Sequence, residues 1–153
     1  MRRAPDVQCV PSEQPVVLLA EDDDELRRLL ARKLRRQGCD VVEARTGTQL
    51  VELVVEHTVQ PIALDQRPAS LVISDLRMPG RSGLDVLRLL RRANVRVPVI
   101  LMTGFGSREV HDEALMLGAA AVFDKPVDLD DLTAAACQLL LDADAEADTV
   151  PLP

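Results

Sequence analysis

Aromatic residues are almost absent from this chain of 153 residues, which has two phenylalanines and neither tyrosine nor tryptophan. Its core must therefore be aliphatic, and an apolar content of 47% is ample for one domain. An excess of basic residues is also lacking, because 25 acidic and 18 basic residues give a formal charge of −7. This balance argues against direct nucleic-acid binding by this chain.

Cysteine is scarce, and no long hydrophobic run is present. Cys9, Cys39 and Cys137 are odd in number and scattered, so they match neither a zinc site nor a disulfide framework. No apolar stretch approaches the ~18 residues of a membrane span, and no secretory signal precedes the first apolar run. We therefore expect a cytoplasmic chain that does not associate with membranes.

Short apolar runs that end in reactive side chains are the main positive feature of the sequence. The runs, with the residues that close them, are Val16–Ala20 with Glu21 and Asp22, Leu71–Ser74 with Asp75, Val97–Met102 with Thr103, and Ala120–Phe123 with Lys125. Apolar runs without alternation are typical of strands covered on both faces, as in a parallel sheet. The carboxyl ends of such strands form the ligand crevice, so one edge should carry chemistry suited to a divalent cation and a phosphoryl group.

Helical patterns alternate with these strands. The expected strands are 16–20, 40–44, 71–74, 97–102 and 120–123, and the expected helices are 24–37, 48–55 or 57, 83–93, 107–117 and 128–141. This order predicts an α/β fold, a (βα)5 doubly wound five-stranded parallel sheet of the flavodoxin-like type.

The ends of the chain are expected to lie outside the folded domain, which spans 16–141. Residues 1–15 contain three prolines and no periodicity, which predicts a flexible N-terminal arm. Residues 142–153 are acidic and small, which predicts a disordered tail. The stretch 58–70 is long for a helix-to-strand connection, so it is either an insertion with its own short turn or a mobile loop.

Three carboxylates should lie together if the first and third strands are neighbours. Glu21, Asp22 and Asp75 would repel one another and raise one another's pKa, so the cluster needs a cation. Hard oxygen ligands indicate Mg²⁺. The alternative is that Glu21–Glu25 is an acidic first helical turn, which we favour for its last three residues but not for Glu21 and Asp22.

The remaining residues of this edge indicate phosphoryl chemistry. Asp75 could merely cap the next segment, but beside two other acids it is better interpreted as a carboxylate that accepts a phosphoryl group. Thr103 is either a loop hydroxyl bonded to its own backbone or a donor to a phosphoryl oxygen. Lys125 is either an ordinary surface lysine or the partner of Asp75 and then of the phosphate.

These motifs closely resemble the receiver domain of two-component response regulators, over about Val16 to Leu141. The matching segments are Glu21-Asp22, Ser74 to Gly80 with Gly83, Thr103-Gly104 and Lys125-Pro126. The sequence from Asp75 to Gly80 is most similar to that of receivers of enhancer-binding transcriptional activators.

The resemblance implies a role for each matching position. Asp75 would accept a phosphoryl group from a histidine kinase or a histidine phosphotransfer protein. Mg²⁺ would be held by Glu21, Asp22 and Asp75, together with the backbone carbonyl of Arg77. The chain would catalyse at most its own phosphorylation from acyl phosphates and its own dephosphorylation.

The resemblance also implies a switch. Thr103 and Lys125 would contact the phosphoryl group, and the Lys125–Pro126 peptide would be cis. The face made by the helix at 107–117, the strand at 120–123 and the helix at 128–141 would then bind an unknown downstream protein or a second copy.

Three features depart from the family. Val122 stands where the family usually has Tyr or Phe, and the period of two points Phe123 to the other face of the sheet. The segment between Gly47 and Asp75 is longer than expected for the family. No output domain is expected after Leu141.

Two other functions stay open. A degenerate receiver that binds proteins without phosphorylation is favoured by Val122 alone and disfavoured by the intact Asp75, Thr103 and Lys125. A Mg²⁺-dependent phosphohydrolase usually has a second acid two residues after its nucleophile, where this chain has Arg77.

The helix at 24–37 is rich in basic residues, namely Arg27, Arg28, Arg32, Lys33, Arg35 and Arg36. They form either a solvated face or a docking surface for the phosphodonor.

Overall fold

The computed structural model describes residues 14–59, 67–104, 106 and 108–148. Within them, five parallel strands form one sheet in the order β2-β1-β3-β4-β5. The strands are β1 (Val16–Ala20), β2 (Asp40–Ala44), β3 (Ala69–Asp75), β4 (Val99–Thr103) and β5 (Ala121–Asp124). The predicted fold class is confirmed.

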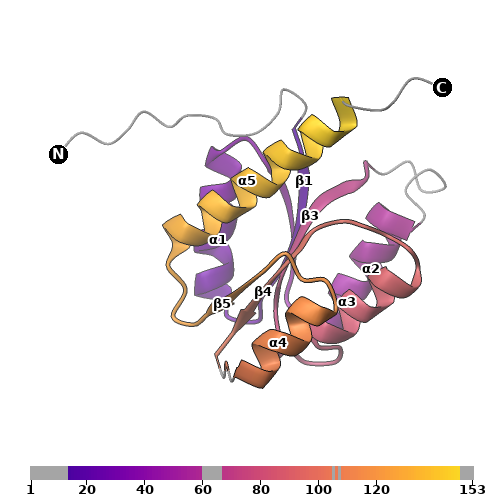
Figure 1. Ribbon diagram of the computed structural model, residues 1–153. Coiled ribbons are helices and arrows are strands. Elements are labelled where there is room, and N and C mark those ends of the chain that lie inside the picture. The colour runs from indigo at the N-terminus through magenta and orange to yellow at the C-terminus, as the bar shows by residue number, and fades with distance from the viewer. Residues whose placement is uncertain (1–13, 60–66, 105, 107, 149–153) are drawn as a thin grey trace.

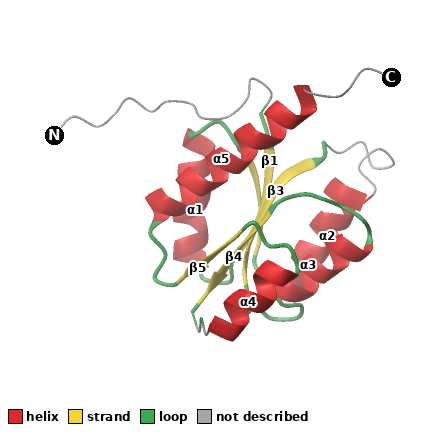
Figure 2. Ribbon diagram, viewed as in Figure 1, coloured by secondary structure: helices red, strands yellow, loops and turns green. Residues whose placement is uncertain are grey.

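The helices cover both faces of this sheet (Figure 1). They are α1 (Asp24–Arg36), α2 (Gly47–Val54) with the π-helical turn η1 (Val55–Val59), α3 (Gly83–Arg92), α4 (Arg108–Met116) and α5 (Leu129–Asp148). Figure 2 shows α1 and α5 on one side of the strands, and α2, α3 and α4 on the other. None of the helices in the described part of the chain is both long and apolar enough to cross a membrane.

Two aliphatic cores explain why the strands are apolar without alternation. Leu18 and Ala20 of β1 pack into the core under α2, α3 and α4, whereas Val17 and Leu19 pack under α1 and α5. All five residues of β1 are buried. Because both faces of β1 exclude water, its side chains must be apolar up to the point where the strand ends.

The helix ends follow local signals in the sequence. Asp23 caps α1, because its Oδ1 accepts hydrogen bonds from the backbone N–H groups of Glu25 and Leu26 at 3.0 and 3.2 Å. Gly38 and Gly118 follow α1 and α4 with φ of 98° and 95°, a conformation that glycine adopts at little cost.

The last helix is longer than predicted. We expected it to end near Leu141, but α5 continues to Asp148. The disordered tail predicted for 142–153 is therefore wrong up to Asp148, and 149–153 lie outside the described residues. Alanine alternates with the acidic residues of this segment, and its high helix propensity explains the extension.

The other segments that we expected to be irregular are described only in part. Of the predicted arm, residues 1–13 lie outside the described residues. The connection predicted at 58–70 is shortened, because η1 extends to Val59 and β3 begins at Ala69; 60–66 lie outside the described residues. Arg67 anchors its end, donating to the carbonyl of Gln14 at 2.8 Å and pairing with Asp40.

The two cysteines in the described part of the chain differ in state. Cys39 is a buried free thiol, whereas Cys137 is disulfide-bonded, which the sequence analysis did not expect.

Gly83, the first residue of α3, packs closely against the end of β3. A Cβ there would lie 2.7 Å from the carbonyl oxygen of Asp75 and 2.9 Å from Leu101 Cδ2. We expect Gly83→Ala to lower the free energy of unfolding by about 1–3 kcal/mol, as overpacking does. Gly104→Ala is the matched control, since the nearest atom to its Cβ is Lys125 Cδ at 4.0 Å; we expect a change below about 1 kcal/mol. Equal urea midpoints for the two variants would contradict this packing argument.

Candidate functional site

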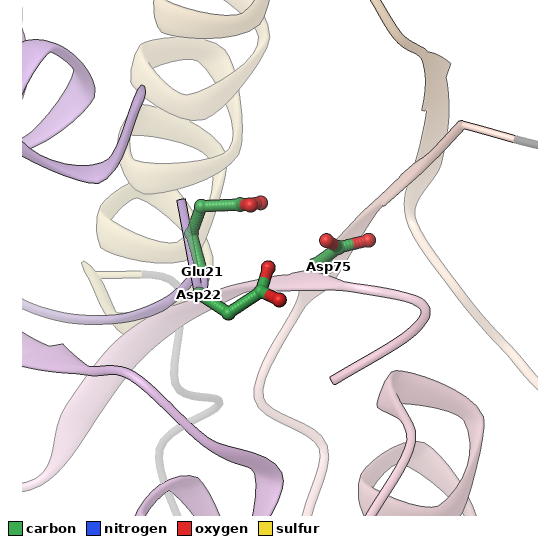
Figure 3. Close-up of side chains that lie close together, drawn as sticks. All are labelled: Glu21, Asp22 and Asp75. Atoms are coloured by element: carbon green, nitrogen blue, oxygen red, sulfur yellow. The ribbon is translucent and has the colours of Figure 1, made fainter. Parts of the chain in front are cut away.

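Three carboxylates meet where β1 and β3 end. Glu21 and Asp22 follow β1 directly, and Asp75 is the last residue of β3. The two strands are paired in register, with Ala20 opposite Ser74, so both end at one edge of the sheet. One oxygen of each carboxylate lies within 4.8 Å of the other two (Figure 3). Glu21 and Asp75 are buried, whereas Asp22 is exposed.

Lys125 places an ammonium group between two of these acids. Its Nζ donates to Glu21 Oε1 and Oε2 at 3.0 and 2.9 Å, and to Asp75 Oδ2 at 2.7 Å. Sequence reasoning expected the contact with Asp75 but not the contact with Glu21. Burial alone would lower the pKa of this ammonium, but the hydrogen bonds to Asp75 and Glu21 outweigh it and raise the pKa. Lys125 therefore remains charged.

The backbone holds the other predicted residues at the same edge. Thr103 is buried at the end of β4, and its carbonyl accepts the backbone N–H of Lys125 at 2.8 Å. Arg77 is exposed in the loop after β3, and its N–H donates to Asp75 Oδ1 at 3.3 Å. The structure thus brings Asp75, Thr103, Lys125 and the acid pair to one edge, while the Arg77 carbonyl remains a predicted ligand.

The donor set fits a hard divalent cation. Burial raises the pKa of Glu21 from 4.5 to about 7; the Lys125 hydrogen bond opposes this effect, and the nearby charge of Asp75 adds to it. One ammonium does not balance three carboxylates, so the cluster is left with excess negative charge. Mg²⁺ takes oxygen ligands and neutralises such a cluster.

Two features of β5 and its end agree with the sequence analysis. Val122 packs into the core under α2, α3 and α4, whereas Phe123 packs into the core under α1 and α5. The period-of-two argument is confirmed, so no aromatic ring of β5 faces α4. The Lys125–Pro126 peptide is cis, as the resemblance implied.

Sequence reasoning missed the role of Arg27. We grouped it with the exposed arginines of α1, but it is 5% exposed and donates to the backbone carbonyl of Glu21. The helical spacing indicated that Arg27 is buried. It precedes Leu30, Ala31 and Leu34, which form the buried face of α1, by three, four and seven residues. Four other basic residues of α1 line a surface hollow with Glu43, namely Arg28, Arg32, Arg35 and Arg36.

The raised pKa of Glu21 predicts how the metal-free protein responds to pH. Between 4.5 and about 7 the folded state binds more protons than the unfolded chain, so stability falls as the pH rises through this window. We expect a loss on the order of 1–3 kcal/mol, measured as urea midpoints in the presence of a chelator. Glu21→Gln should flatten the profile, and an equal slope in this variant would assign the effect to another group.

Comparisons with known proteins agree with this geometry. The response regulator receiver domain matches residues 17–137 as a family model. The regulatory protein AtoC of Escherichia coli (strain K12) is 34% identical over 116 residues, which are 76% of this chain and 23% of AtoC. The sporulation initiation phosphotransferase F of Bacillus subtilis (strain 168) is 28% identical over 116 residues, 76% of this chain and 86% of that protein.

The solved receiver domain of the Francisella response regulator 1452 has 25% sequence identity and a TM-score of 0.74. The match covers 85% of this chain and 99% of that one. The matched region thus spans less than a quarter of AtoC but nearly all of a separately solved receiver domain. Since the family match runs from β1 into α5, this chain belongs to the response regulator receiver domains.

Proposed function

We propose that this chain is the phosphoacceptor of a two-component phosphorelay. Asp75 takes a phosphoryl group from a histidine kinase or a histidine phosphotransfer protein in a Mg²⁺-dependent reaction. The observation that carries the proposal is the position of the Asp75 carboxylate, which is buried beside two other acids and held at 2.7 Å by Lys125 Nζ.

The transfer forms one bond and breaks one. An oxygen of the Asp75 carboxylate attacks the phosphorus of a phosphohistidine, and a phosphorus–oxygen bond forms. The phosphorus–nitrogen bond breaks, and the imidazole leaves with its electron pair and takes up a proton. The product on this chain is an acyl phosphate.

The residues around Asp75 stabilise the transferred group. Lys125 is already within hydrogen-bond distance of the reacting carboxylate, so its charge can follow the phosphoryl oxygens without a large movement. Thr103 ends the neighbouring strand and supplies a hydroxyl at the same edge. Mg²⁺, held by Glu21, Asp22, Asp75 and the Arg77 carbonyl, would neutralise the charge on the transferring group.

Phosphorylation would act on the face formed by α4, β5 and α5. It adds nearly two negative charges at the strand ends, and Thr103 and Lys125, whose backbones are bonded, carry the effect to β4 and β5. On α4, Leu115 and Met116 are 52% and 88% exposed, which offers an apolar surface to a partner. We propose that this face binds a downstream protein or a second copy of the chain.

The two alternatives have weaker support. Arg77 stands two residues after Asp75, so the second acid of an aspartate phosphohydrolase is missing from that position. A phosphorylation-independent binding module is favoured by Val122, which gives the α4 side of β5 no aromatic ring to move.

Phosphoryl uptake tests the proposal. The protein is incubated with Mg²⁺ and acetyl phosphate and then weighed intact by mass spectrometry. We expect a single phosphate adduct in the native chain and in the control Asp131→Asn, which changes an exposed acid of α5. We expect no adduct in Asp75→Asn or with a chelator present.

The other outcomes would each overturn the proposal. An adduct retained in Asp75→Asn would place the acceptor elsewhere. Bound Mg²⁺ without an adduct would indicate the binding module, and release of phosphate over many turnovers would indicate the hydrolase.

A further inference from the structure

One arginine of α1 is buried behind the acid pair. Arg27 is 5% exposed, although the side chain is among those least often buried. A buried guanidinium is costly unless its donors are paired. Its Nη1 donates to the carbonyl of Glu21 at 3.0 Å and lies 2.8 Å from Asp24 Oδ1. Its Nε donates to Glu43 Oε1 at 3.2 Å.

These contacts fix the backbone from which the acid pair projects. The Glu21 N–H donates to the carbonyl of Ala44 on β2 at 3.1 Å, and the Glu21 carbonyl accepts from Arg27. The peptide groups on both sides of Glu21 are thus held by neighbouring elements. The direction of the Glu21 side chain, and of Asp22 immediately after it, depends on this backbone.

The fork of the guanidinium is suited to this task. Its planar donors reach three acceptors at once, on the segment after β1, on α1 and on β2. The acceptors are themselves held: Asp24 also pairs with Arg45 at 2.6 Å, and Glu43 also pairs with Arg35 at 3.1 Å. Hydrogen bonds from Arg45, the larger effect, and from Arg27 lower the pKa of Asp24 to about 2, so the Asp24 carboxylate stays charged.

We propose that Arg27 is a positioning residue of the metal site. By holding the Glu21 carbonyl, it aims the acid pair at Asp75 and so sets the affinity for Mg²⁺. This inference rests on the proposed function, because it assigns Mg²⁺ to the cluster. Arg27 contacts the backbone carbonyl of Glu21 and not the carboxylates proposed to bind the metal, so it acts through the backbone.

The test is a Mg²⁺ titration of the full chain by calorimetry, with Arg27→Lys and Arg27→Met. Outer partners of metal ligands change affinity by about 10–100-fold when they are mutated. We expect Arg27→Met to raise the Kd for Mg²⁺ by about tenfold or more, and Arg27→Lys to raise it less. At saturating Mg²⁺, phosphoryl uptake should return toward that of the native chain. Arg28→Lys, which changes an exposed arginine of the same helix, should leave the Kd unchanged.

The outcomes separate this inference from the proposed function. If the native chain binds no Mg²⁺, the proposed function fails, and the inference fails with it. If the native chain binds Mg²⁺ and folded Arg27 variants keep its Kd, only the Arg27 inference is overturned, even where their melting temperature falls. Should Arg27→Met not fold, the titration of Arg27→Lys decides whether Arg27 sets the Mg²⁺ affinity, because lysine keeps the positive charge and the aliphatic part of the side chain.

Discussion

The ammonium group of Lys125 is the contact on which the site depends. Glu21 and Asp75 are buried at the ends of adjacent strands, and without a cation between them their charges would repel in a poorly hydrated setting. Lys125 meets both acids at 2.7 to 3.0 Å, although it belongs to the segment after β5, beyond β4 in the sheet. The contact joins the ends of three strands. It also places a positive charge where a phosphoryl group would arrive.

The acid pair is supported from two directions by cations of different kinds. Lys125 contacts the carboxylate oxygens, and as a single flexible ammonium it can move from a carboxylate to a phosphate. Arg27 contacts the backbone of the same pair through a rigid fork anchored on α1 and β2. Lys125 thus lies beside the carboxylates, where charge must be redistributed during phosphoryl transfer. Arg27 lies beside the backbone, where the position of the acid pair must be kept.

Much of this arrangement follows from the sequence, and the rest depends on long-range packing. The apolar runs predicted the strands, and the strand ends predicted that Asp75 and the acids after β1 would lie together. The helical spacing of Arg27 indicated that it is buried. We overlooked this because so many other residues of α1 are basic. The contact between Lys125 and Glu21 could not be predicted, because it depends on how far a side chain from the end of β5 reaches past β4 and β3. We predicted that α5 ends about seven residues too early, because we gave the acidic charge of this segment more weight than the high helix propensity of its alanines.

The most direct measurement locates the phosphoryl group on the chain. After phosphorylation with Mg²⁺ and acetyl phosphate, borohydride reduces an aspartyl phosphate to homoserine, and peptide mass mapping identifies the altered position. Our account predicts homoserine at position 75 and at no other aspartate or glutamate. Homoserine at Asp22, or an unaltered Asp75 in protein that carries phosphate, would contradict it.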